Sequence, residues 1–326
     1  MARGDVRGGA SVRRARHGGD IELTVGRRRF ALTHPEKVLF ADDGITKADL
    51  VAYYRDVAGP MLEHVRGRPL MLQRCPDGLA GGCFYQKEAS RHFPDWIRTL
   101  EVAKAGGTVR HVVCDDEATL AYLAGQASVA FHPWLARADR LDRPDRVMFD
   151  FDPSRDDFPA VRAGAEAAGH LLAEIGLTPF VATTGSRGLH VVAPLTRRSS
   201  FEEVRTFSRR AADLLSASDP ERLTTEARKE RRLGRVLIDV MRNAYGQTAV
   251  APYSVRTIPG APVATPLEWS ELGSARLGPQ RFGLRNVRER LDARGDPWAG
   301  LQLHARALGP AQRQLDELTR TRRRAS

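Results

Sequence analysis

Two acidic residues, separated by a single position, close an apolar segment at residues 146–152. In a strand, residues i and i+2 point to the same face, so Asp150 and Asp152 would share one face while Phe149 and Phe151 occupy the other. Two carboxylates at that spacing repel each other unless a cation lies between them, and oxygen ligands suit Mg²⁺ or Mn²⁺. The pair is therefore a candidate metal site; the alternative is an Asp pair facing solvent at a strand end.

A third carboxylate, Asp239, lies at the end of a second apolar segment, residues 235–240. Taken alone, an acidic residue in that place is more often a cap or a turn residue. Together with Asp150 and Asp152 it completes the set that two-metal phosphoryl transfer requires, in which two cations clamp the attacking and leaving oxygens. We predict that these three residues are catalytic and bind two divalent ions.

A segment rich in glycine and hydroxyl groups, Thr183–His190, lies between two apolar segments. The N–H groups of such a loop can face phosphates, and Arg187 adds a bidentate donor. The Gly-Lys-Ser/Thr ending of a Walker loop is missing, and a plain glycine hairpin is the alternative. Further along, Arg256 follows a polar stretch that begins at Asp239 and could hold a triphosphate; the alternative is a surface arginine.

Two adjacent aromatic residues, Phe84 and Tyr85, precede Lys87 in a glycine-rich segment. This arrangement suits stacking on the bases of a splayed or single strand, whereas half-buried core aromatics are the alternative. Two more lysines, Lys37 and Lys47, lie beside the first predicted helix. They could grip a terminal phosphate, or they could be ordinary surface lysines.

The elements that must position these groups alternate between strands and helices. The first helix is expected to start at Thr46, as an N-cap with Asp49 three residues later. The predicted strands are 21–25, 108–114, 146–152, 179–183, 189–193 and 235–240. The predicted helices are 46–54, 116–127, 160–175, 201–216 and about 302–326. This mixture predicts the α/β (α+β) class.

The domain organisation is predicted from shifts in composition. Residues 1–19 are rich in Arg and Gly and are expected to be a disordered basic arm. Residues 20–145 would form an N-terminal lobe, 146–305 a catalytic core, and 306–326 a C-terminal helix with a basic tail.

The 326-residue chain holds 51 Lys and Arg against 40 Asp and Glu, a net charge of +11. This excess favours polyanionic partners, although a generally basic, solvated surface is the alternative. No apolar run is long enough to span a bilayer, and no secretory signal is visible, so we expect a cytoplasmic protein without a membrane partner. The three cysteines, Cys75, Cys83 and Cys114, are expected to be reduced thiols.

Seven motifs, in order, resemble those of the archaeo-eukaryotic primase superfamily, and more closely those of the polymerase domain of bacterial ATP-dependent DNA ligase D. They are His34–Phe40, Gly44–Lys47, Phe84–Lys87, His132–Trp134, Asp150–Pro153, Thr184–His190 and Ala251–Arg256. The resemblance covers roughly residues 20–305. It implies a primase-like fold, with a mixed, largely antiparallel catalytic sheet flanked by helices and an N-terminal lobe.

The resemblance also implies a role for each residue. Asp150, Asp152 and Asp239 would hold two Mn²⁺ or Mg²⁺ ions. Nucleotide binding falls to His132, Thr184, Ser186, Arg187, His190, Arg242, Asn243 and Arg256. Lys37 and Lys47 resemble the pair that binds a recessed DNA 5′-phosphate. Phe84 and Tyr85, with Lys87, resemble the group that stacks on the template base.

Some positions depart from the family pattern. Tyr85 stands where Phe is frequent, and Thr184 where Ser is frequent; both keep the chemistry. Arg187 and Arg242 stand where Lys or an amide residue often occurs.

The activity implied is that of a template-dependent and terminal-transferase-like DNA/RNA polymerase in non-homologous end joining. It would add nucleotides, with NTPs preferred to dNTPs, to 3′ ends at gaps and double-strand breaks. Expected partners are gapped DNA with a 5′-phosphate, Ku and a separate ATP-dependent DNA ligase, because no Lys-x-Asp-Gly adenylation motif occurs here. The alternatives are a primase that starts chains without a primer, and a non-catalytic module that binds DNA ends.

Overall fold

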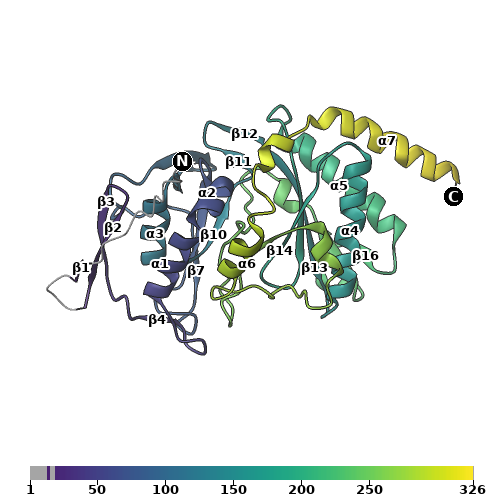
Figure 1. Cartoon of the computed structure of the whole chain (residues 1–326). Helices are drawn as coiled ribbons and strands as arrows, with labels where there is room; N and C mark the ends of the chain where they lie inside the picture. Colours follow the sequence, from purple (N-terminus) through teal and green to yellow (C-terminus); the bar gives the residue numbers. More distant parts are fainter. Residues whose placement is uncertain (1–12, 15–18, 326) are drawn as a thin grey trace, which may run out of the picture.

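The computed structural model describes residues 13–14 and 19–325 (Figure 1). Most of the basic arm predicted at 1–19 lies outside the described residues. The described part begins with a three-stranded sheet in which β2 pairs with both of its neighbours. Its strands are β1 (Arg13–Arg14), β2 (Ile21–Val25) and β3 (Arg28–Leu32).

A five-stranded antiparallel sheet forms the centre of the N-terminal lobe, in the order β10-β6-β9-β8 with β7 also paired to β6. Its strands are β6 (Pro69–Arg74), β7 (Phe84–Gln86), β8 (Thr99–Lys104), β9 (Gly107–Val113) and β10 (Ser128–Pro133). The lobe also contains β4 (Val38–Phe40), β5 (Ile45–Thr46), α1 (Lys47–Asp56), α2 (Ala58–Val65) and α3 (Glu117–Gly125). Thr46 and Asp49 form the predicted capping box at the start of α1.

A six-stranded sheet forms the second lobe, in the order β16-β17-β13-β15-β14-β18. Its strands are β13 (Arg146–Pro153), β14 (Phe180–Thr183), β15 (Leu189–Pro194), β16 (Leu223–Thr224), β17 (Val236–Asp239) and β18 (Pro266–Leu267). Every pairing is antiparallel except that of β16 with β17. The predicted mixed, largely antiparallel sheet is therefore confirmed.

Three helices cover the face of this sheet that is turned away from the N-terminal lobe (Figure 1). They are α4 (Phe158–Glu174), α5 (Phe201–Ser218) and α7 (Leu308–Ala325). Phe149 and Phe151 of β13 are buried against them, as the alternation of the strand predicts. The next residues along β13, Asp150 and Asp152, consequently face the N-terminal lobe.

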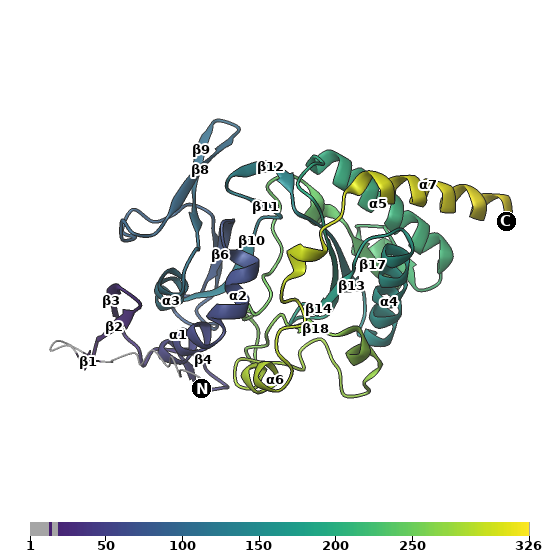
Figure 2. The ribbon, with the colours of Figure 1, turned by 45° about the horizontal axis from the view of Figure 1, so that its top comes forward.

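The remaining elements are short strands, one further α-helix and four 3₁₀ helices. They are β11 (Ala136–Arg137), β12 (Arg140–Pro144), α6 (Val287–Arg294), and the 3₁₀ helices η1 (Lys229–Arg231), η2 (Met241–Asn243), η3 (Trp269–Gly273) and η4 (Leu301–His304). Figure 2 shows the two lobes side by side, with the hairpin β8–β9 projecting from the N-terminal one. No helix in the described part of the chain is long and apolar enough to cross a membrane.

The core of the N-terminal lobe is completed by residues from the far end of the sequence. Tyr253, Val263 and Val287 are fully buried in it, beside α1 and α3. Buried tyrosines of α1 hold this returning segment: the Tyr53 hydroxyl donates to the Tyr253 carbonyl at 2.8 Å. The chain therefore passes from the first lobe to the second and returns to the first.

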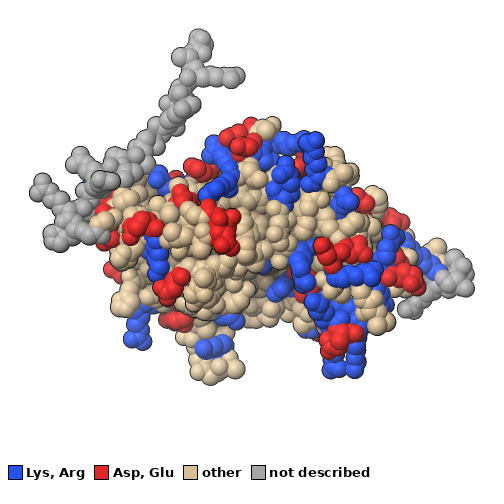
Figure 3. Space-filling model, turned by 90° about the horizontal axis from the view of Figure 1, so that it is seen from below, with Lys and Arg blue, Asp and Glu red and all other residues tan. Residues whose placement is uncertain are grey.

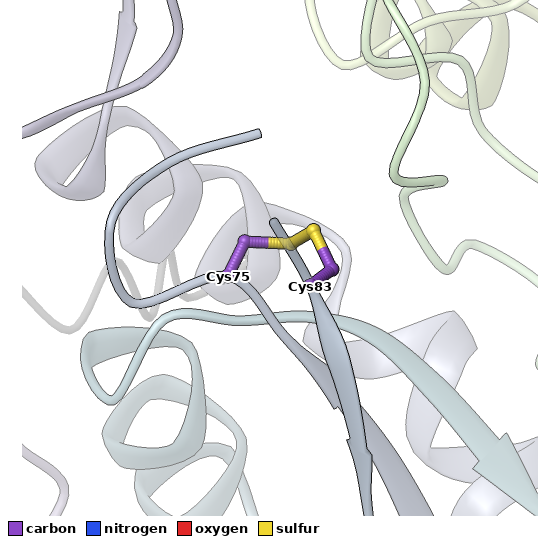
Figure 4. The surroundings of a disulfide bond; sticks show 2 residues. All are labelled: Cys75 and Cys83. Carbon is purple, nitrogen blue, oxygen red and sulfur yellow. A yellow bond between two sulfur atoms is a disulfide. The ribbon is translucent and has the colours of Figure 1, made fainter. Parts of the chain in front are cut away.

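Two of the three cysteines are joined. Cys75 and Cys83 form a disulfide that closes the loop between β6 and β7 (Figure 4). The expectation of three reduced thiols is thus wrong for this pair, while Cys114 is free and buried. The reason lies in the path of the chain: β6 and β7 are antiparallel neighbours, so the loop returns and brings the two Cα atoms to 4.3 Å.

Candidate active site

Antiparallel pairing aligns the candidate catalytic groups in a row across the second sheet. Asp239 on β17 lies directly opposite Asp150 on β13, and Asp150 lies directly opposite His190 on β15. Asp152 follows two residues after Asp150 and projects to the same face. All four line a cavity of about 470 Å³ between this sheet and the N-terminal lobe, which contributes Met71, Tyr85 and His132.

The two opposed carboxylates have pKa values shifted in opposite directions. Burial alone would raise the pKa of Asp150, but His190 and Arg242 outweigh it and lower that pKa. Their nitrogens lie 3.6 Å and 3.8 Å from the Asp150 oxygens. Burial raises the pKa of Asp239, and the negative charge of Asp150 raises it further. Asp239 also accepts a hydrogen bond from the Met241 N–H at 2.7 Å.

The third carboxylate, Asp152, is held by two arginines. Arg187 donates to one oxygen at 2.9 Å and Arg232 to the other at 3.1 Å. Arg232 was not predicted, because its sequence signal is only a basic run at 228–235. Among residues 13–14 and 19–325, no three His, Cys, Asp or Glu side chains are gathered closely enough to form a metal cluster.

The loop between β14 and β15 is folded by its own hydroxyl group. The Thr184 Oγ1 accepts from the N–H groups of Ser186 and Gly188, both at 3.2 Å. Any Cβ at Gly188 would lie 1.9 Å from the Phe151 carbonyl oxygen, so only glycine fits there. Gly185 has a φ of +63°, and a Cβ there would lie 2.8 Å from the Ala264 backbone nitrogen. The loop thus lies flat against β13 and turns Ser186 and Arg187 into the cavity.

Two further residues of the cavity wall are the basic Arg256 and the neutral His132. Arg256 donates to the Thr184 carbonyl at 2.8 Å, and burial lowers its pKa. Burial also lowers the pKa of His132 to about 3, with Arg256 and Arg242 contributing, so this imidazole is neutral. Its Nε2 is buried and has no hydrogen-bond partner among the described residues. The ring packs edge-on against Tyr85, with centroids 5.7 Å apart.

The predicted phosphate-binding lysines are neighbours at the base of α1. The Lys47 N–H donates to the Lys37 carbonyl at 2.8 Å, and burial together with the charge of Lys37 lowers the pKa of Lys47. The ammonium of Lys47 donates to the Thr33 carbonyl at 2.5 Å, and that of Lys37 to Asp77 at 2.8 Å. Asp77 belongs to the loop that the disulfide closes, so this loop touches the lysine pair directly.

Comparison with models of known protein families gives a match that includes the residues of the cavity. The model of the LigD primase-polymerase domain matches residues 46–298. The chain belongs to the LigD primase-polymerase family.

Relatives in this family include the multifunctional non-homologous end joining protein LigD of Pseudomonas aeruginosa, 33% identical over 295 residues. That match covers 88% of this chain and 34% of the relative. The bifunctional LigD of Bacillus subtilis is 30% identical over 273 residues, which cover 83% of this chain and 44% of the relative. The chain thus spans less than half the length of these relatives.

A solved structure, the polymerase domain of Mycobacterium tuberculosis ligase D in complex with DNA, superposes with a TM-score of 0.80 at 32% identity. The match covers 85% of this chain and 99% of the other. The primase-polymerase fold predicted from the sequence is therefore shown.

Besides Lys37 and Lys47, three more predicted residues do not line the cavity of this primase-polymerase domain. The amide of Asn243 is fully buried and is bonded to the Met148 backbone on both sides, at 2.9 and 2.7 Å, so it fixes the turn after β17 instead. Lys87 lines a neighbouring cavity of about 440 Å³ with Trp134 and Tyr245. Phe84 is half exposed, and the guanidinium of Arg74 lies 5.8 Å from its ring.

Proposed function

We propose that this protein is a template-dependent and terminal-transferase-like polymerase that adds nucleotides, preferably NTPs, to 3′ ends at gaps and breaks. The observation that supports it most is the row formed by Asp239, Asp150 and His190 across three strands, with Asp152 beside it. The row faces a cavity whose other walls carry Arg187, Arg232, Arg242 and Arg256. Such a division between acidic and basic walls suits a metal-bound triphosphate.

The three carboxylates are the proposed ligands of two Mn²⁺ or Mg²⁺ ions. The chemistry of the donor set fits, because it consists only of carboxylate oxygens, although the three side chains are not gathered into a cluster among the described residues. The negative charge of Asp150 raises the pKa of Asp239, and a cation between these two carboxylates would relieve their repulsion. Divalent ions held by these three carboxylates would supply activation of a 3′-hydroxyl and positive charge at the phosphates of the nucleotide. Arg187 and Arg232 would then release Asp152 and turn to the nucleotide phosphates.

The remaining polar groups are proposed to orient the nucleotide. Arg256 and Arg242 would bind its phosphates, and Thr184 would keep the loop in the shape that presents Ser186. His190, fixed against Asp150, is a donor to a phosphate oxygen. The neutral His132 has a free ring nitrogen, which suits a hydrogen bond to the sugar or base of an incoming nucleotide.

DNA contacts are proposed for the N-terminal lobe, residues 20–145, with 146–305 as the catalytic core and 306–326 as a C-terminal extension. Lys37 and Lys47 would bind a 5′-phosphate, and the exposed rings of Phe84 and Tyr85, with Lys87, would face the template. The superposed Mycobacterium tuberculosis domain is in complex with DNA, which supports this. The relatives' names support a role in non-homologous end joining. The proposal further places the protein in the bacterial cytoplasm, with Ku and a separate ligase as partners.

The test is extension of a primer across a short gap with a downstream 5′-phosphate, in Mn²⁺, with NTPs and dNTPs compared. We expect Asp150→Ala to lose at least about a hundredfold in rate, because one of the three proposed metal ligands is removed. Asp156→Ala, at an exposed carboxylate just beyond β13, is the matched control and should match the wild type. Extension that survives in Asp150→Ala would rule out this site. Synthesis on a bare single strand would favour a primase.

A further inference from the structure

A second cavity, of about 540 Å³, lies between η3, the segment after it, and α6. None of its lining residues lines the catalytic cavity. Four of them are arginines: Arg276, Arg281, Arg290 and Arg294. Only two carboxylates line it, Glu271 and Glu289, so its walls carry an excess of positive charge.

Arg290 forms the buried wall of this cavity. It is only 7% exposed, and its guanidinium lies 5.3 Å from the centre of the Phe282 ring. One terminal nitrogen pairs with Glu271, but Nε and Nη1 have no hydrogen-bond partner among the described residues. Buried polar groups are nearly always bonded, so unpartnered donors beside a cavity indicate an acceptor that comes from outside the chain.

Two further arginines at the rim are not neutralised. Arg276 and Arg281 are exposed, and neither side chain has an ion pair or hydrogen bond with another described residue. Arg294 has only a distant contact, 3.7 Å from Glu268. Glu271, the nearer carboxylate, is already shared between Arg290 and the Glu268 N–H. Glu289, the other lining carboxylate, has no ion pair with a described residue either, so the unpaired guanidinium groups of Arg276 and Arg281 outnumber one free carboxylate. Guanidinium geometry matches phosphate oxygens.

The cavity is linked to the catalytic loop by a direct contact. Gln280, which precedes the lining residues Arg281 and Phe282, donates to the Ser186 carbonyl at 2.9 Å. On the other side, Arg285 donates to the Asp43 carbonyl, near the start of α1. The segment that contributes Arg281 and Phe282 to the cavity is thus bonded at one end to the catalytic loop and at the other to the turn before α1. Figure 3 views the molecule from below and shows Lys and Arg gathered mainly over the C-terminal half.

We propose that this cavity is a second phosphate-binding site, which holds either a backbone phosphate of bound DNA or a phosphate of a second free nucleotide. Arg276 and Arg281 would bind the phosphate oxygens bidentately, and Arg290 would supply the buried positive charge. The inference rests on the arginines and on the cavity, and it holds whether or not the carboxylate row catalyses extension.

The experiment compares wild type with Arg276→Gln/Arg281→Gln, and with the control Arg313→Gln/Arg320→Gln, which removes the same charge from exposed positions of α7. Labelled gapped DNA is titrated at several KCl concentrations. Each lost phosphate contact reduces the magnitude of the slope of log K against log salt by about 0.9, so the cavity variant, which loses one phosphate, should lose about 0.9 in slope. The control should keep the wild-type slope.

Calorimetry with ATP alone tests the other source of phosphate. If a free nucleotide occupies the cavity, wild type binds two ATP and the cavity variant binds one, while both bind DNA equally. A wild-type slope together with a wild-type ATP stoichiometry in the cavity variant overturns the proposal. Asp150→Ala, measured alongside, separates the two hypotheses, because it should lose extension and keep the wild-type DNA slope.

Discussion

The buried imidazole of His132 makes a residue-level prediction about pH. Its pKa is lowered to about 3 by burial and by two arginines, whereas an unfolded histidine titrates near 6.5. Below pH 6.5 this histidine is protonated in the unfolded chain but stays neutral in the folded chain. The free energy of unfolding therefore falls as the pH falls. The expected loss from this residue is on the order of 2 kcal/mol at pH 5.

Urea denaturation of wild type and His132→Phe from pH 8 to pH 5 checks this. The variant should lose less stability on acidification, because it has no imidazole to protonate at this position. It should also bind NTP more weakly, by roughly threefold to tenfold, since one hydrogen bond between neutral groups is lost. Identical slopes of stability against pH in the two proteins would contradict the assignment.

At the same scale, the sequence predicted most of the site but not how its members interact. That Asp150 and Asp152 share a face follows from the alternation of one strand. That Asp239 lies opposite Asp150 depends on the register between two strands far apart in the chain, which no local pattern sets. Arg232 was missed because it is one basic residue in a basic run. Asn243 was expected to bind the nucleotide, yet its side-chain amide forms hydrogen bonds with the N–H and the carbonyl of Met148.

At the scale of elements, the disulfide in the loop between β6 and β7 allows a test of how much this loop contributes to stability. Its disulfide restrains the unfolded chain, so breaking it should lower the free energy of unfolding by roughly 2–3 kcal/mol for a loop of this length. We expect reductant to lower the melting temperature of wild type by several degrees. Cys75→Ser/Cys83→Ser should start at the lower value and be insensitive to reductant. Equal melting temperatures of wild type with and without reductant would contradict the bond.

Elements that have a hydrophobic period were predictable, and those without one were not. The strands at 146–152, 189–193 and 235–240 were located within one residue at each end, since their apolar runs are distinct. The capping box of α1 was visible because Thr46 and Asp49 have the required spacing. The edge strands β16 and β18 have two residues each, too few to show any period. The disulfide was missed because it depends on how β6 and β7 pair.

At the scale of the whole molecule, the sequence could not show how the two lobes interlock. A boundary near residue 145 follows from composition and motif order, and it treats the lobes as successive segments. In the structure, residues 251–263 return to the N-terminal core and bond to α1. Such a return is a long-range contact, whose existence depends on the fold of everything between the two segments.

The interlocking predicts that the two lobes unfold together. The hydroxyl of Tyr54 donates to the Val129 carbonyl at 2.5 Å and accepts from the Val255 N–H at 3.0 Å, so it joins the lobe's own sheet to the returning segment. Tyr54→Phe leaves two buried backbone groups unpaired and should cost about 1–3 kcal/mol each. Tyr245→Phe, at a half-exposed tyrosine, is the control and should cost much less.

Two single-tryptophan proteins report on the lobes separately. One keeps only Trp96, which packs on Phe30 in the N-terminal lobe, and the other keeps only Trp269, which packs on Gly169 of α4. The urea transitions of the two proteins should coincide. Tyr54→Phe should shift both transitions to lower urea by the same amount, because the core of the N-terminal lobe cannot form without the returning segment, residues 251–263. If Tyr54→Phe shifts the Trp96 transition alone, the lobes are independent and the returning segment does not couple them.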